Sequence, residues 1–359
     1  MPSLFDPIRL GAIEAPNRIL MAPLTRARST VDHVPTAVMA DYYSQRASAG
    51  LIISEATGIS REGLGWPRAP GLWTAAQVEA WKPVTQAVHA AGGRIFAQLW
   101  HMGRLVHPSF LDGARPASPS ATTGPGKAHT YVGRLLYEEA RALEIGEIPR
   151  VIGDYVAAAR NAMTAGFDGV QIHAANGYLV DEFLRSNTNL RDDDYGGSPE
   201  NRARFLREVA SAVAGEVGAG RTAVRLSPNG ESQGAFDPDP GPVFAEAAKA
   251  LDAIGIAFLE LREPGPEGTF GSTDQPKQSP LIRRHFKGPL VLNSDYLAVD
   301  AEADIADGRA DAISFGRPFI SNPDLPRRIA KDAPLAHSEV SDWYGEGPKG
   351  YSDWPVWAG

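Results

Sequence analysis

The segment HAANGYLVDEFL, residues 173–184, concentrates side chains that could carry out chemistry. His173, Asn176 and Tyr178 stand close together in it, and Gly177 permits a sharp turn between them. Histidine and asparagine can donate hydrogen bonds to a carbonyl oxygen, and a tyrosine with an ordinary pKa of ~10 can deliver a proton. A histidine alone at a strand end is more often structural, but the three together predict a site that polarises an acceptor and protonates it.

Two segments late in the chain suggest a phosphate site. Asn293-Ser294-Asp295 and Gly316-Arg317 each end a short apolar run. They offer backbone donors, small residues for close approach and one cation, which is the set that binds phosphate in many proteins. A surface turn with a solvated arginine is the alternative, and spacing alone leaves both interpretations open.

Three further polar residues suit a flavin. Arg225 and Gln98 could stabilise the negative charge that a reduced isoalloxazine carries near N1 and its C2 carbonyl, and Thr25 could donate to the opposite edge. Each has a structural alternative. Arg225 could form an ion pair, Gln98 could be a satisfied core amide, and Thr25 could cap a strand end. Only their combination favours a flavin.

Short apolar runs rich in β-branched residues must position these side chains. Eight such runs occur, at residues 18–25, 51–57, 95–101, 169–175, 223–228, 258–263, 290–295 and 312–317. They are apolar on both alternating faces, which is typical of buried parallel strands.

The segments between these runs show helical spacing. Two apolar stripes illustrate it, namely Val78, Trp81, Val84 and Val88, and Ile152, Val156, Ala159 and Met163. Ser198-Pro199 has the form of an N-cap followed by proline at the first helical position, which predicts that another helix begins there.

Eight strand and helix repeats favour an α/β fold of the TIM (β/α)8 barrel type. A doubly wound sheet also alternates strands and helices, but no GxGxxG follows the first strand. Residues 1–17 could form a hairpin that closes the barrel bottom, and residues 102–149 predict a loop excursion after the third strand, as a lid or substrate wall. We therefore expect one domain over residues 1–359.

The predicted strand ends disfavour several chemistries that barrels support. In a barrel the reactive groups stand at the C-terminal ends of the strands. No strand ends in lysine, which disfavours a Schiff-base aldolase, and the fourth and seventh do not both end in glutamate, as in a retaining glycosidase. We also find no carboxylate set able to hold magnesium, so no metal site is expected.

Composition narrows the partners. The net charge of −8 disfavours nucleic acid or an anionic membrane surface, and the absence of cysteine excludes disulfides, thiolate nucleophiles and iron–sulfur clusters. The start MPSLFDPIRLG resembles no signal peptide, and no apolar run reaches the ~18 residues of a membrane span. These features predict a cytoplasmic protein with a small-molecule substrate.

Seven motifs, in order, resemble the Old Yellow Enzyme family of FMN-dependent ene reductases over essentially the whole chain. They are APLTR (22–26), SEAT (54–57), FAQLWH (96–101), HAANGYLVDEFLRSNTNLRDDDYGG (173–197), RLSP (225–228), FGRPFISNPDL (315–325) and WYGEGPKGYSDWP (343–355). The resemblance implies an NAD(P)H-dependent reductase of activated alkenes, with FMN as cofactor and NADH or NADPH as reductant in a ping-pong cycle.

The resemblance also implies residue roles. His173 and Asn176 would hold the carbonyl or nitro oxygen of the substrate, and Tyr178 would protonate the α-carbon after hydride reaches the β-carbon. The isoalloxazine would lie among Pro23, Leu24, Thr25, Ala56, Gln98 and Arg225; the phosphate among Asn293, Ser294, Asp295, Gly316 and Arg317; and the pocket walls would be Trp66, Trp100 and Phe270.

Some positions depart from the common family pattern. Asn293-Ser294-Asp295 stands where many relatives have glycines, and Asn176 stands where part of the family has a second histidine. Two alternatives also stay open at this point. The chain could be an FMN barrel that oxidises a saturated substrate, or a barrel that binds a phosphorylated ligand without catalysis. The preferred nicotinamide, the physiological substrate and the choice between monomer and homo-oligomer do not follow from the sequence.

Overall fold

The computed structural model describes residues 1–359, and its centre is a closed barrel of eight parallel strands. In barrel order they are β3 (Ile19–Met21), β4 (Ile52–Gly58), β5 (Ile95–Trp100), β10 (Gly169–Ala174), β11 (Thr222–Leu226), β12 (Leu259–Arg262), β13 (Leu290–Asn293) and β14 (Ala312–Phe315). Each strand overlaps one of the eight predicted apolar runs, so the predicted (β/α)8 barrel is confirmed.

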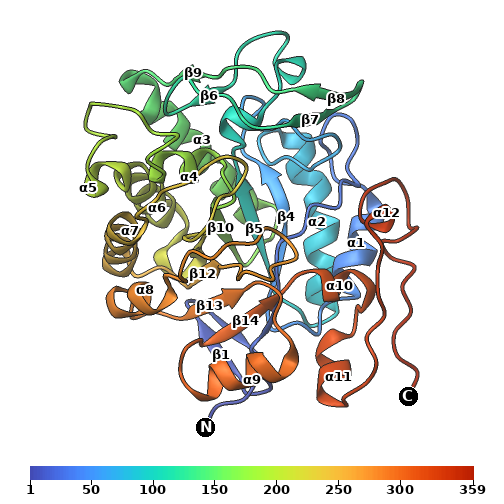
Figure 1. Cartoon of the computed structure of the whole chain (residues 1–359). Helices are drawn as coiled ribbons and strands as arrows, with labels where there is room; N and C mark the ends of the chain where they lie inside the picture. Colours follow the sequence, from blue (N-terminus) through green and yellow to red (C-terminus); the bar gives the residue numbers. More distant parts are fainter.

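Helices surround the barrel (Figure 1). They are α1 (Ala37–Ser44), α2 (Ala75–Ala90), α3 (Ile148–Thr164), α4 (Leu179–Leu184), α5 (Pro199–Arg202), α6 (Arg204–Val217), α7 (Gly241–Ile254), α8 (Ser279–His285), α9 (Ala298–Ala306), α10 (Arg317–Ser321), α11 (Leu325–Ala330) and α12 (Val340–Trp343). Ser198 caps α5 by accepting a hydrogen bond from the Asn201 N–H, as predicted. None of these helices combines the length and apolar character that a membrane crossing requires.

Two helices test the predicted apolar stripes. All four stripe residues of α2 are buried, so that prediction is confirmed. The stripe proposed for α3 is wrong by about one residue, because the buried face of α3 is formed by Val151, Tyr155, Ala158 and Ala162 together with Ile148 and Ala159. Small alanines let this helix pack closely, and the larger Ile152, Val156 and Met163 lie at the edge of the contact, partly buried.

An N-terminal hairpin closes one end of the barrel, as predicted. Strands β1 (Ile8–Leu10) and β2 (Ile13–Ala15) pair antiparallel through a turn at Gly11. Gly11 has φ +60°, and a Cβ there would lie 2.2 Å from the Gly220 carbonyl oxygen, so only glycine fits this contact. The hairpin and the strand beginnings share a cluster of 12 buried apolar residues, including Phe96 and Phe258.

The excursion at residues 102–149 lies at the opposite end of the barrel from this hairpin (Figure 1). It contains short structure of its own: β6 (Ala117–Ser118) pairs with β9 (Arg141–Ala142), and β7 (Lys127–Thr130) pairs with β8 (Gly133–Leu136). Two of its residues hold a carboxylate of α4, since the Arg104 N–H and the Ser118 hydroxyl donate to Glu182 at 2.9 Å each.

The C-terminal segment packs against the loop that follows β3. The Arg26 guanidinium donates to the carbonyl oxygens of Trp343 and Gly350, at 2.9 and 2.6 Å. The rings of Tyr42 and Tyr351 stack at 4.0 Å between centroids. Residues far apart in sequence therefore form one wall beside the C-terminal ends of the strands.

Candidate active site

The structure brings the trio His173, Asn176 and Tyr178 together at the end of β10. His173 lies on the strand, Asn176 in the following turn, and Tyr178 directly before α4. The His173 and Tyr178 ring centroids are 5.0 Å apart, and Trp100 at the end of β5 lies 6.4 Å from the first ring and 5.0 Å from the second. The rings of His173 and Tyr178 thus pack against one aromatic wall at Trp100.

The turn that carries Asn176 needs a special backbone. Asn176 has φ +61° and Gly177 has φ +75°, which asparagine and glycine adopt more readily than other residues. A Cβ at Gly177 would lie 2.3 Å from the Ser232 carbonyl oxygen, and the Gly177 N–H donates to Asp181 Oδ2 at 2.9 Å. The sequence Asn-Gly therefore fixes the position of Tyr178 relative to His173.

Burial sets the protonation states of two members of the trio. Desolvation, with the nearby positive charges of Arg225 and Arg262, lowers the pKa of His173 well below its usual value, so the imidazole is neutral at pH 7. Desolvation also raises the pKa of Tyr178, so the phenol keeps its proton. A neutral donor and a protonated phenol suit hydrogen bonding to an oxygen and delivery of a proton.

A chain of buried polar side chains fills the barrel beneath this turn. Gln98 donates to Gln171 at 2.8 Å, Gln171 donates to Glu260 at 2.7 Å, and the Ser314 hydroxyl donates to Glu260 at 2.5 Å. Sequence reasoning missed Gln171, Glu260 and Ser314. A signal was present, because Gln171 and Glu260 interrupt runs that are otherwise apolar.

Arg225 on β11 joins this chain through its terminal nitrogens, while its Nε has no partner. Its Nη2 donates to Asn293 Oδ1 at 2.8 Å, and its Nη1 lies 3.6 Å from Glu260 Oε1, so the structural ion pair weighed for it does exist. Asn293 in turn donates to the Ser314 carbonyl oxygen at 2.7 Å. The Asn293 side chain is thereby directed to Arg225, and only its backbone is left for a phosphate.

Several buried polar atoms lack partners at the C-terminal side of the barrel. Among them are Arg225 Nε, His173 Nδ1 and Trp100 Nε1, on the adjacent strands β5, β10 and β11. Buried polar groups without partners are rare, and a cluster of them indicates a ligand that supplies hydrogen bonds. A flat heterocycle such as isoalloxazine fits this place, since Ala56 is buried nearby on β4 and Pro23, Leu24 and Thr25 lie partly buried after β3.

The predicted phosphate residues lie together at the ends of β13 and β14. Ser294 and Asp295 have φ +118° and +49°, a backbone that glycine adopts more easily. The Arg317 Nη2 donates to Asp295 Oδ1 at 2.8 Å, and Thr269 hydrogen-bonds both side chains. The structure thus pairs the predicted cation with a predicted neighbour, which the sequence did not indicate.

The three predicted wall residues differ in burial. Trp100 is buried, and Trp66 is partly buried in the same apolar cluster as Trp100 and Tyr178. Phe270 is 64% exposed, and its ring lies 4.8 Å from the Arg262 guanidinium. The structure therefore brings two of the walls to the trio directly and connects the third only through Arg262.

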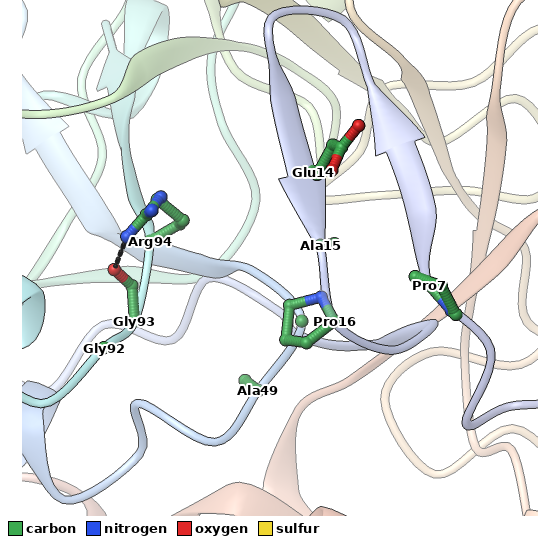
Figure 2. A pocket seen from close by; sticks show the side chains of 9 residues that line it. Pro7, Glu14, Ala15, Pro16, Ala49, Gly92, Gly93 and Arg94 are labelled. Atoms are coloured by element: carbon green, nitrogen blue, oxygen red, sulfur yellow. Dashed lines mark hydrogen bonds between the residues drawn. The ribbon is translucent and has the colours of Figure 1, made fainter.

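A separate cavity of about 310 Å³ lies at the other end of the barrel (Figure 2). It is lined by the N-terminal hairpin and by residues that precede β4 and β5. Its two charged residues are Glu14 and Arg94, and Arg94 Nη1 donates to the Gly93 carbonyl oxygen at 2.9 Å. No member of the trio or of the buried polar chain contributes to it, so it is not the reaction site.

The fold and the strand ends define a class of protein, the barrel oxidoreductases that bind a flavin at the C-terminal mouth. A sequence model of the NADH:flavin oxidoreductase / NADH oxidase family matches residues 3–336, and the chain belongs to this family. The Old Yellow Enzyme resemblance is thereby confirmed, and the protein is an FMN-dependent oxidoreductase.

Individual relatives agree with this membership. The Old Yellow Enzyme homologue from Zymomonas mobilis is 63% identical, with a TM-score of 0.98, over 99% of this chain and 100% of its own. Morphinone reductase, solved with tetrahydroNAD, is 45% identical with a TM-score of 0.93, over 99% of this chain and 98% of its own. 12-Oxophytodienoate reductase 2 of Arabidopsis thaliana is 40% identical over 98% of this chain and 95% of its own.

Proposed function

We propose that the protein reduces the activated C=C bond of α,β-unsaturated carbonyl or nitro compounds, with NADH or NADPH as reductant. The observation that carries the proposal is the trio of His173, Asn176 and Tyr178 beside the unpartnered buried atoms at the barrel mouth. Bound FMN supplies the hydride for the β-carbon. The relatives named as reductases support the same type of reaction.

The chain's own groups bind the substrate and move the proton. His173 and Asn176 donate to the carbonyl or nitro oxygen, which draws electrons from the β-carbon. The phenol of Tyr178 gives its proton to the α-carbon as general acid, which its raised pKa permits at neutral pH. Gln98 and Arg225 hold the electron-rich edge of the isoalloxazine, and Thr25 the opposite edge. The remaining proposed contacts are Pro23, Leu24 and Ala56 at the ring, and Asn293, Ser294, Asp295, Gly316 and Arg317 at the phosphate.

The nicotinamide and the alkene would use one pocket in turn, which gives a ping-pong cycle. The morphinone reductase complex with tetrahydroNAD supports binding of a nicotinamide by a closely similar chain. We infer that residues 1–359 form one domain in which residues 102–149, with Trp66, Trp100 and Phe270, form the substrate wall. A cytoplasmic location stays a prediction.

The test is spectroscopic and kinetic. Purified holoenzyme should show flavin absorbance, and the flavin should bleach with NADH or NADPH and recover with cyclohexenone or a maleimide. A colourless protein, or a flavoprotein that neither reductant can bleach, would contradict the proposal. Bleaching by a saturated substrate without nicotinamide would instead support the dehydrogenase alternative.

A further inference from the structure

Arg262 is a buried cation at the barrel mouth to which the proposed reaction gives no role. It is the last residue of β12 and is 5% exposed. Its guanidinium forms no direct ion pair, and Asp181 and Asp295 favour its charge only from a distance. A buried charge without a directly contacting carboxylate costs stability, which makes a functional role worth testing.

The guanidinium touches three different segments. Its Nη1 donates to Asn176 Oδ1 and to the Ser232 hydroxyl, both at 3.3 Å, and its Nη2 donates to the Phe270 carbonyl oxygen. Burial and the positive charge of Arg225 lower the pKa of Arg262 to about 10, which still leaves it charged at neutral pH. The turn after β10 therefore meets a group that is charged at neutral pH.

This contact decides which way the Asn176 amide points. A guanidinium can only donate, so the amide must turn its oxygen to Arg262. The Nδ2 hydrogens then point the other way, and no protein acceptor binds them. Without Arg262 the amide could turn over and present its oxygen to a substrate oxygen, which would repel it. A cation on the amide oxygen also polarises the amide and strengthens its N–H as a donor.

We propose that Arg262 is a positioning residue that orients the Asn176 amide, so that its N–H groups face the substrate oxygen. The inference rests on the proposed function, in which Asn176 is one of the two donors. A purely structural role is the competing explanation, because Arg262 also ties Ser232 and Phe270 to the barrel mouth.

A double-mutant cycle on the FMN holoenzyme separates the two. R262M keeps an unbranched, flexible side chain but removes the charge and the donors, N176A removes the amide, and R262M/N176A combines them. We expect N176A to lower kcat/KM for cyclohexenone about 10²-fold, as for loss of one oxyanion donor. R262M should cost about tenfold, as for residues that orient a directly contacting group. The double variant should be no slower than N176A.

A rescue experiment adds a readout that a structural role would not move. Histidine at position 176 donates through a ring N–H whose presentation needs no amide orientation. R262M/N176H should therefore match N176H to within about twofold, the accuracy with which independent effects add. Binding of a para-substituted phenol, which accepts hydrogen bonds but is not reduced, should weaken in R262M and N176A and should not weaken further in R262M/N176A.

Controls identify each failure. R284M, at an exposed arginine of α8, should behave as wild type. If R262M does not retain FMN, or if its thermal midpoint falls, R262K takes its place in the experiment. R262K keeps the charge and the donors, so we expect near wild-type kinetics. Multiplicative losses in the cycle, wild-type kinetics in R262M, or no rescue by N176H would overturn the inference. Wild-type holoenzyme that fails with every enone would overturn the proposed function itself.

Discussion

At the N-terminal ends of its strands the barrel is filled by apolar side chains, whereas at the C-terminal ends it is filled by polar ones. The first end buries a 12-residue cluster that includes Leu20, Phe96 and Phe258. The second buries the hydrogen-bonded chain from Gln98 to Glu260, and several of its polar atoms have no partner.

The two ends make opposite contributions to stability. Apolar burial stabilises by roughly 25 cal/mol per Å², while a buried polar group without a partner costs about 1–3 kcal/mol. The unpartnered polar groups at the C-terminal end therefore lower the stability, and apolar burial in the rest of the core compensates for them. Changes at the two ends should separate, with activity lost at one end and stability at the other.

The largest expected effect is at the site end. Tyr178→Phe removes the proton of the proposed general acid and should lower the rate of enone reduction by ~10²–10⁴-fold, the usual contribution of such a group. Stopped-flow reoxidation of the reduced enzyme by cyclohexenone measures it. A loss under tenfold would show that solvent supplies the proton, and flavin reduction by NADPH provides the control step.

The matching change at the apolar end is Phe258→Ala. This side chain is fully buried, with its ring 5.8 Å from that of Phe96. Truncation should lower the free energy of unfolding by about 3–5 kcal/mol because it leaves a cavity. Urea unfolding measures the loss. The activity of the folded fraction should be unchanged, and a fall in kcat at intact stability would break the comparison.

His173→Ala should also affect activity alone. The neutral imidazole is one of the two proposed donors to the substrate oxygen, and removing such a donor costs about 10²–10³-fold. Steady-state kcat/KM with an enone is the measurement. His285→Ala on α8 is the matched control, and equal rates in wild type and H173A would remove His173 from the mechanism.

Glu182, on the helix that follows Tyr178, should make the stability of the protein depend on pH. Burial raises its pKa to about 8 from a usual 4.5, although Arg104 opposes the shift. A raised folded-state pKa favours the protonated form, so this contribution to stability is complete below about pH 4.5 and is lost as the pH rises toward 8. The slope can reach ~1.4 kcal/mol per pH unit.

Urea unfolding between pH 5 and 8 tests this, with E182Q as the variant that cannot titrate. Wild type should lose stability across this range and E182Q should lose less. Glu14→Gln, at an exposed residue of the hairpin end, should keep the wild-type slope. Parallel curves for wild type and E182Q would contradict the prediction.

The smallest expected effect concerns the phosphate corner. Asp295 pairs with Arg317 at 2.8 Å, and both side chains are about one-third exposed. Asp295→Asn should free the guanidinium and remove a charge that repels phosphate. Because solvent screens the pair, we expect FMN to bind the apoprotein only about fivefold more tightly, or ~1 kcal/mol. Fluorescence quenching of FMN measures the affinity, with D307N as control. Weaker binding would show that Asp295 shapes the site.

The local pattern was sufficient for the strands and for the trio. Each strand is a short β-branched run whose character does not depend on distant residues, and eight such runs with helices between them can close into a barrel. The trio lies within one turn, so its proximity is also local. The α3 stripe was misjudged because which face a helix buries depends on what it packs against.

The pairings between segments could not be read from the sequence. Arg262 meets Asn176 from 86 positions away, and Arg317 meets both Asp295 and Thr269, which stands in a different loop. These contacts depend on strand register and on where two loops fold back. Amino-acid composition and hydrophobic periodicity specify neither the strand register nor the path of the loops.

By itself the sequence determined the barrel and the family, and it predicted which residues would donate, protonate and bind a flavin. Only the tertiary structure decided how these groups are presented: His173 neutral, Asn176 oriented by Arg262, and Arg317 held by Asp295. The physical reason is that residue type fixes what a side chain can do, whereas burial and neighbours fix its charge and direction.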